Sequence, residues 1–133
     1  VTDLNLIYFI DLSMMIFLIT AQYFIYPSFK NIDISKLSNF HTSYQRKVII
    51  ILGPIMVLQI AFISIDFISE INTKSTIRLS LLSLCWVLTA LISVPLHKKI
   101  EDKIDLGNSI EKLILTNYPR MILWSLIFLT NYV

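Results

Sequence analysis

The sequence KVIIILGPIMVLQIAFISIDFIS, which covers Lys47–Ser69, is long and apolar enough to cross a membrane. At a rise of ~1.5 Å per residue it reaches roughly 34 Å, which exceeds a hydrocarbon core of ~30 Å. After the opening lysine, its only strongly polar side chains are Gln59 and Asp66. A helix in a soluble core would carry a polar stripe, and this stretch has none. It is therefore predicted to be a transmembrane helix.

The same helix is predicted to begin before the membrane, in the polar segment 28–46. Asp33 or Ser35 can cap its first turn. Within the membrane, Gly53-Pro54 is expected to kink it, because a proline has no N–H to donate to the preceding turn. An apolar stripe at helical spacing supports the early start: Ile34, Leu37, Phe40 and Tyr44.

Three further stretches are apolar enough to span the membrane, and the four together occupy most of the chain. Hydrophobic residues make up 56% of the sequence and charged residues 15%, which is typical of polytopic membrane proteins. The sequence therefore predicts an all-α, integral membrane four-helix bundle in a single transmembrane domain. Val1 in place of methionine leaves open whether the termini are complete. The predicted spans are Leu4–Tyr26, Lys47–Ser69, Ser75–Leu96 and Asn117–Val133.

Local signals predict where these helices begin and end. Pro27 is expected to end the first helix, because the residue before a proline is displaced from the α region. The short turn 70–74 makes the second and third spans antiparallel neighbours. Pro95 is expected to distort the last turn of the third span. Asn108, with Glu111 three residues later, matches a capping box and is expected to open the last helix.

Basic residues lie mostly on one side of the predicted membrane. Nine of them belong to the linkers that follow the first and third spans, and two lie on the opposite side. By the positive-inside rule the linkers are cytoplasmic and both termini are outside. Their scatter gives no dense basic surface, so no nucleic-acid partner is expected. The nine are Lys30, Lys36, Arg46, Lys47, Lys98, Lys99, Lys103, Lys112 and Arg120; the two are Lys74 and Arg78.

Six side chains fall at one predicted depth, where the helices meet the cytoplasmic side of the membrane. Imidazole is the commonest metal ligand, so one hypothesis is that His41 and His97 bind a metal ion, a haem or a small hydrophobic molecule there. The alternative is that these side chains anchor helix ends to lipid headgroups. The six candidate ligand-binding residues are His41, His97, Tyr26, Tyr44, Asn117 and Arg120.

Polar side chains inside the spans need partners, because lipid offers none. Gln59 lies near the midplane and is also a candidate for the ligand site, while Asp11 is expected to face the bundle or its outer boundary. The partners considered for Gln59 are Gln22, Ser83 and Thr89. Small side chains on the third span form a ridge that lets another helix approach closely: Cys85, Thr89 and Ser93.

Several short segments resemble a family of uncharacterised bacterial proteins with four transmembrane helices. They are FHTSY followed by KVIIILGPIMVLQ, then VPLHKKI, then GNSIEKLILTNYPRMILW. The family pattern is YPxF, YHxxYxxRI…GPxMxxE, PxHxxL and NWxRTxxW. The chain is also distantly similar to anthrone-oxygenase-like four-span proteins, whose third span ends in VPL before a polar residue. The matching residues are Tyr26, Pro27, His41, Tyr44, Gly53, Pro54, Met56, Pro95, His97, Asn117, Arg120 and Trp124.

The resemblance implies a four-helix fold in the bacterial inner (cytoplasmic) membrane, and it implies no defined activity. Three positions depart from the pattern: Gln59 replaces a glutamate, Lys47 replaces an arginine, and Tyr118-Pro119 replaces a tryptophan and its neighbour. The lost glutamate is the only carboxylate that would join His41 and His97, which disfavours a metal or acid–base role.

Two functional predictions follow from these residues. The favoured one is a non-catalytic subunit or accessory component of a larger membrane assembly, whose partners are the lipid bilayer and other membrane subunits. The alternative is a haem-, metal- or small-hydrophobic-ligand-binding protein, including an oxidoreductase, with its site at the cytoplasmic end of the bundle. The sequence contains no nucleotide-binding loop and no HExxH, GxSxG or CxxC motif. It therefore points to no particular reaction, and it leaves open whether the protein is an enzyme.

Overall fold

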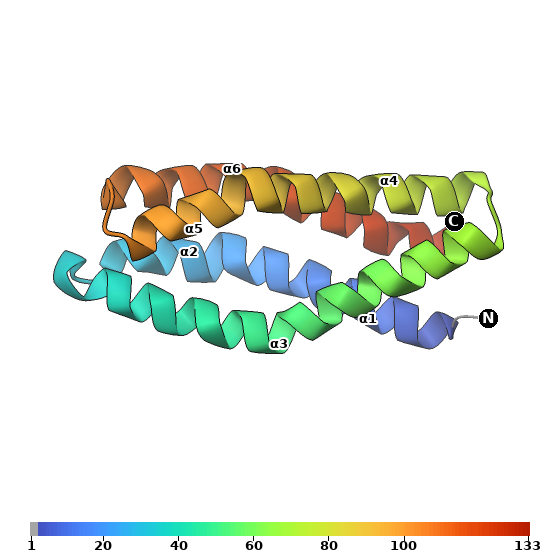
Figure 1. The fold of residues 1–133 in the computed structure, drawn as a ribbon, viewed down its shortest axis with the longest axis horizontal. Helices are drawn as coiled ribbons and strands as arrows, with labels where there is room; N and C mark the ends of the chain where they lie inside the picture. Colours follow the sequence, from blue (N-terminus) through green and yellow to red (C-terminus); the bar gives the residue numbers. More distant parts are fainter. Residues whose placement is uncertain (1–2) are drawn as a thin grey trace.

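Four long helices packed side by side make up the protein (Figure 1). The computed structural model describes residues 3–133, and within that range it contains no strand, which confirms the predicted all-α bundle. Val1 lies outside the described residues. In chain order the elements are α1 (Leu4–Thr20), the π-helical turn η1 (Ala21–Ile25), α2 (Tyr26–Ser28), the 3₁₀ turn η2 (Phe29–Asn31), α3 (Ile34–Ser69), α4 (Thr73–Leu88), the π-helical turn η3 (Thr89–Ser93), α5 (Val94–Glu101), α6 (Leu106–Leu129) and the 3₁₀ turn η4 (Thr130–Tyr132).

Each of the four helices is long and apolar enough to cross a membrane, as expected of an integral membrane protein. Large apolar side chains such as Ile49, Val57 and Leu91 are exposed on the outer surface. Lipid would cover them, because acyl chains are as apolar as these side chains. The helical segments that satisfy this criterion are Leu4–Asn31, Ile34–Ser69, Thr73–Glu101 and Leu106–Tyr132.

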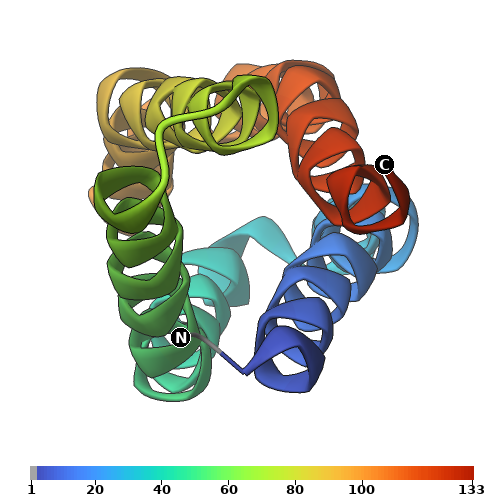
Figure 2. The same ribbon diagram turned by 90° about the vertical axis from the view of Figure 1, so that its right-hand side faces the viewer.

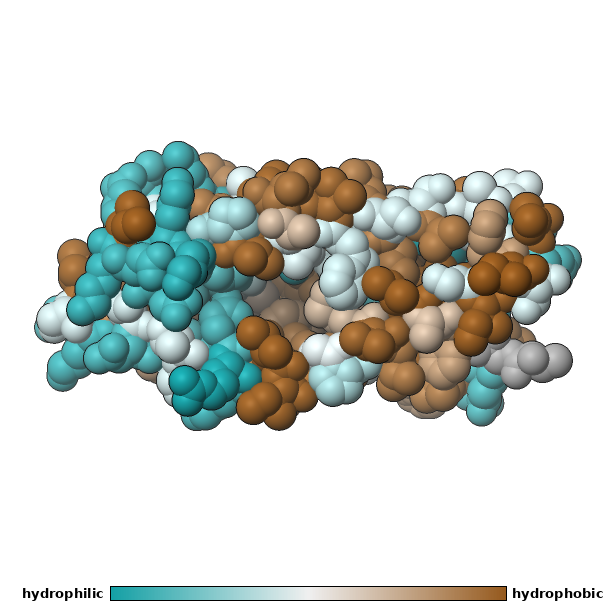
Figure 3. Space-filling model, viewed as in Figure 1, coloured by the Kyte–Doolittle hydropathy of each residue, from teal (hydrophilic) through white to brown (hydrophobic). Residues whose placement is uncertain are grey.

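All four helices extend beyond the predicted spans at the same end of the bundle. The first continues to Asn31, the second begins at Ile34, the third continues to Glu101 and the fourth begins at Leu106. Figure 3 shows hydrophilic side chains gathered over this end, which we call the polar end. The chain's C-terminus and the turn between α3 and α4 lie at the opposite end (Figure 1).

Helix α3 runs unbroken from the polar end into the apolar part of the bundle, as the sequence predicts. The side chain of Asp33 caps it by accepting a hydrogen bond of 3.1 Å from the backbone N–H of Ser35. Pro54 lies inside the helix, and Figure 1 shows α3 changing direction near its middle. The missing N–H of Pro54 and the bulk of its ring account for this bend.

Viewed end-on, the four helices occupy the corners of a square (Figure 2). Helix α1 lies next to α3 and α6, and α4 also lies next to α3 and α6. The diagonal pairs are therefore α1 with α4 and α3 with α6. One polar network, centred on Asp11 and Gln59, crosses both diagonals.

The prediction that Pro27 ends the first helix is wrong. The chain stays helical to Asn31 because a π-helical turn precedes the proline: the N–H of Tyr26 donates to the carbonyl of Ala21, five residues earlier. The same device precedes Pro95, where the N–H of Val94 donates to Thr89. The wider turn makes room for the proline ring, so each helix is distorted and continues.

The predicted capping box at Asn108 and Glu111 is also wrong. Helix α6 begins two residues before Asn108, after Asp105, whose left-handed backbone (φ 47°, ψ 53°) closes the loop after α5. Asn108 instead donates from Nδ2 to Asp105 Oδ2 at 2.9 Å. The capping box lies on α4, where Asn72 and Ser75 satisfy each other's backbone N–H.

Candidate ligand-binding site

A cavity of about 590 Å³ opens between α3 and the helix formed by α4, η3 and α5, next to the polar end. Figure 3 shows the surface hollowed at the edge of the hydrophilic region. Small-molecule sites in proteins occupy roughly 300–1,000 Å³ and are mostly apolar, with a few polar groups. This cavity has the same make-up. Its apolar lining includes Met14, Phe17, Leu18, Val48, Leu52 and Met56.

Small side chains and distorted helices leave this space open. Gly53 lies on the wall that α3 contributes, and Thr89 and Ser93 lie on the facing wall in the π-helical turn η3. The ridge predicted from the sequence therefore divides. Cys85 is buried in the apolar core beside Leu82 and Trp124, whereas Thr89 and Ser93 line the cavity.

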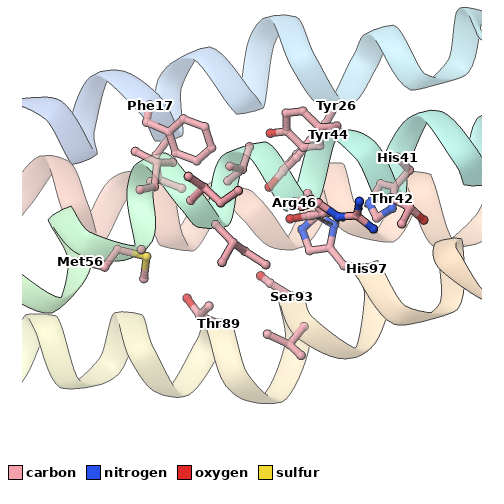
Figure 4. A pocket seen from close by; sticks show the side chains of 18 of the residues that line it. Phe17, Tyr26, His41, Thr42, Tyr44, Arg46, Met56, Thr89, Ser93 and His97 are labelled. Atoms are coloured by element: carbon pink, nitrogen blue, oxygen red, sulfur yellow. Dashed lines mark hydrogen bonds between the residues drawn. The ribbon is translucent and has the colours of Figure 1, made fainter.

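Two histidines meet at the polar side of the cavity (Figure 4). His41 Nε2 on α3 lies 2.8 Å from His97 Nδ1 on α5, and the two rings stack with centroids 5.0 Å apart. The side-chain amide of Gln45, one turn after His41, contacts the same nitrogen of His97. An unprotonated imidazole nitrogen has one lone pair, so His41 and Gln45 compete for it.

A buried arginine forms another part of the wall. Arg120 is 7% exposed, and its Nε donates to Thr89 Oγ1 at 3.0 Å while Nη1 donates to Asn117 Oδ1 at 3.2 Å. Its guanidinium carbon lies 5.5 Å from the ring centroid of Trp124, a cation–π distance. Asn117 is fixed in turn by a 2.8 Å hydrogen bond to Gln22 Oε1. The position of the guanidinium is therefore set by neutral groups.

Several polar atoms on this wall have no partner in the protein. Within residues 3–133, four buried side-chain atoms lack a hydrogen bond, and three of them belong to cavity residues: His41 Nδ1, Tyr44 Oη and Ser93 Oγ. The fourth is Trp86 Nε1. Buried polar groups normally find partners, so these three atoms mark the part of the wall whose hydrogen bonds the protein itself leaves unmade.

The structure places five of the seven candidate residues on the cavity: His41, His97, Tyr26, Tyr44 and Arg120. Asn117 does not line it but supports Arg120 from behind. Sequence reasoning missed Gln45, although its position four residues after His41 on one helix could have indicated it. It also missed Ser93 and Thr89 as site residues, because small residues in a membrane helix are equally explained by packing.

Gln59 belongs to a different network. Its Nε2 donates to Asp11 Oδ1 at 2.8 Å and its Oε1 accepts from Trp124 Nε1 at 2.9 Å, so none of the three predicted partners bonds to it. Asp11 also receives hydrogen bonds from Arg78 Nη2 at 2.7 Å and Asn131 Nδ2 at 2.9 Å. This network joins α1 to α4 across one diagonal of the bundle and α3 to α6 across the other.

The donor set at the two histidines does not favour a metal ion. Among the residues that the structure describes, no group of three or more His, Cys, Asp or Glu side chains is placed to hold one. Protein metal sites such as those of zinc use at least three ligands, and here the two imidazoles hydrogen-bond to each other. The arrangement suits hydrogen bonding to a ligand better than metal coordination.

Comparisons with models of protein families, with curated proteins and with solved structures give no match. The resemblance to the four-span bacterial family therefore stays a prediction. The fold and the cavity define the chain as a helical membrane protein with a mostly apolar pocket that carries a few polar side chains.

Proposed function

We propose that this protein binds a small, largely apolar molecule in the cavity at the polar end of the bundle. The observation that supports this most directly is the cavity itself, which measures about 590 Å³ and is mostly apolar, with a few polar side chains such as Tyr26, Tyr44 and Arg120 on its wall. An apolar ligand with one polar group would match this lining and fill the space. The proposal is one of binding and assigns no reaction.

The predicted role as a non-catalytic subunit of a larger assembly is favoured because no carboxylate joins the two histidines, and it requires apolar outer faces on which partners can dock. A bilayer requires such faces on every membrane-spanning helix, whether or not a partner protein docks there. They therefore do not discriminate between the two functions. The cavity is the observation that favours ligand binding.

We further propose that the polar end faces the cytoplasm of a bacterium and that the protein lies in the inner membrane. Arg78 and Arg120 are buried, so neither contributes to the charge that faces water. Among the remaining basic residues, only Lys74 lies at the opposite end, which strengthens the asymmetry behind the positive-inside rule. Those at the polar end are Lys30, Lys36, Arg46, Lys47, Lys98, Lys99, Lys103 and Lys112.

A matched pair of variants tests the binding proposal. Ser93→Leu fills the cavity, whereas Ser83→Leu adds the same side chain at an exposed position of α4, where the hydroxyl bonds only to its own helix. Native mass spectrometry of the detergent-solubilised protein with dodecanoate and dodecan-1-ol should show a bound amphiphile in wild type and Ser83→Leu. Ser93→Leu should lose it while keeping its helical circular dichroism.

Equal binding by all three proteins would mean that the amphiphile sits on the outer surface, and the proposal would be wrong. Absence of any bound amphiphile in wild type would contradict it as well.

A further inference from the structure

Two arginines are buried inside this bundle, and only one has a counterion. Arg78 is 4% exposed, and its Nη2 lies 2.7 Å from the carboxylate of Asp11. Arg120 is 7% exposed, and none of the ion pairs formed within residues 3–133 includes it. A buried, uncompensated charge is costly, most of all at membrane depth.

From this difference we infer that the ligand of the cavity is an amphipathic monoanion, and that Arg120 binds its charged group. The inference rests on the proposed binding function and names the chemical class of the ligand. A guanidinium carries five N–H donors; Thr89 and Asn117 each accept one, the neutral phenol of Tyr26 is a third hydrogen-bond partner, and the remaining donors are left for a ligand. These hydrogen bonds orient the fork on the cavity wall, the geometry that suits a carboxylate or phosphate.

The other charged groups around the cavity do not take this role. Lys98 is exposed and lies 3.8 Å from Glu101 and 3.2 Å from Asp102, so its charge is already balanced. Arg46 is exposed at the rim, where water reaches it. His41 and His97 are hydrogen-bonded to each other. One uncompensated buried charge calls for a ligand with a single negative charge.

The rest of the cavity suits an apolar chain or ring. Figure 4 shows His41 and His97 at one side of the cavity, and Phe17 and Met56 toward the other. Exposed apolar side chains lie around the opening: Ile49, Ile50 and Val94 are 66%, 67% and 57% exposed. A ligand can therefore enter sideways from the bilayer, with its charged group at the depth of the polar end.

Two sources share this chemistry: a free carboxylate with an apolar chain, and the phosphodiester of an anionic phospholipid. Binding of dodecanoate, dodecan-1-ol and methyl dodecanoate should be measured by titration of the purified full chain in a neutral detergent. Phosphatidylglycerol and zwitterionic phosphatidylcholine in nanodiscs form the second arm. In wild type, dodecanoate should bind roughly tenfold or more tightly than either neutral analogue, as expected for charge-assisted hydrogen bonds.

Variants connect the preference to the arginine. Arg120→Met should abolish the preference for the anion, and Arg120→Lys should retain part of it, because the charge stays while the fork is lost. Lys36→Gln, an exposed cation at the same end, serves as control and should leave the preference unchanged. If Arg120→Met does not fold, the wild-type comparison of acid, alcohol and ester still decides the matter.

Different outcomes test the anionic character of the ligand and the binding function itself. Equal affinities for acid, alcohol and ester, together with no preference for phosphatidylglycerol, would refute the anionic ligand and leave the binding function standing. Failure of every compound to bind would refute both. A preference for phosphatidylglycerol over phosphatidylcholine without tight dodecanoate binding would support the inference and identify a bilayer lipid as the source.

Discussion

Two buried sets of polar residues differ in how completely their side chains are hydrogen-bonded. Both oxygens of the Asp11 carboxylate have partners, because Gln59, Arg78 and Asn131 all donate to it. The polar groups of the cavity wall are instead incompletely partnered, as Tyr44 and Ser93 show. Fully partnered networks stabilise one arrangement of the helices, whereas the polar atoms of the cavity wall add little to that stability.

The Asp11 network leads to a prediction about stability. Asp11→Asn should lower the free energy of unfolding by about 3–5 kcal/mol, because it leaves the guanidinium of Arg78 buried without a counterion. Thermal unfolding in detergent, followed by circular dichroism, measures this. The control Asp102→Asn removes an exposed partner of Lys98 and should cost about 0–1 kcal/mol.

The double variant Asp11→Asn/Arg78→Met should recover most of the loss, because no charge then remains unpaired. Additive losses in the double variant would contradict this account of the network.

At the scale of the elements, helix ends and helix distortions are set by backbone hydrogen bonds. The π-helical turns before Pro27 and Pro95 let both helices continue past a proline. The second of these turns also forms part of the cavity wall through Thr89 and Ser93. A local irregularity that accommodates a proline thus contributes to the site, in keeping with the frequent occurrence of π-helical turns at functional sites.

The caps lead to a prediction at this scale. Asn72→Ala removes the capping box of α4 and should lower the free energy of unfolding by about 0.5–2 kcal/mol. Asn108→Ala makes the same chemical change inside α6, where the side chain caps nothing, and should have an effect below about 0.5 kcal/mol. Detergent unfolding curves for the two variants compare them directly, and a larger loss for Asn108→Ala would contradict the observed start of α6.

At the scale of the whole molecule, the polar end and the apolar band define how the bundle sits in a membrane. Basic side chains that face water gather at the polar end, and the cavity opens where that end meets the apolar surface (Figure 3). A ligand's charged group would then lie near the lipid headgroups while its apolar part reaches inward. The orientation of the bundle therefore decides on which side of the membrane the site lies.

Cysteine labelling tests this orientation. Ile71→Cys lies in the exposed turn at the opposite end, and Ile104→Cys lies in the exposed loop at the polar end. In intact cells an impermeant maleimide should label Ile71→Cys, and it should label Ile104→Cys only after permeabilisation. The native Cys85 is buried and serves as the unlabelled background. The reverse pattern would overturn the proposed orientation.

The sequence alone predicted the four long apolar helices, the early start of α3 at a cap of Asp33 or Ser35, and the presence of Pro54 inside that helix; the structure selects Asp33 as the cap. These features depend on apolar length and on neighbouring residues along the chain, which can be read without knowing the fold. The sequence also indicated that His41 and His97 reach the membrane at one depth, because each lies just outside a predicted span.

Other features, such as side-chain partners and the cavity, follow from the tertiary structure, because they depend on which helices face each other. The partners of Gln59 are Asp11 and Trp124 on two other helices, and no spacing along one helix could select them. The cavity likewise lies between a bent α3 and the turn η3, and it forms only where these two helices are brought side by side. Arg78 contacts a carboxylate, whereas Arg120 contacts only neutral groups. This difference is a consequence of packing across the bundle.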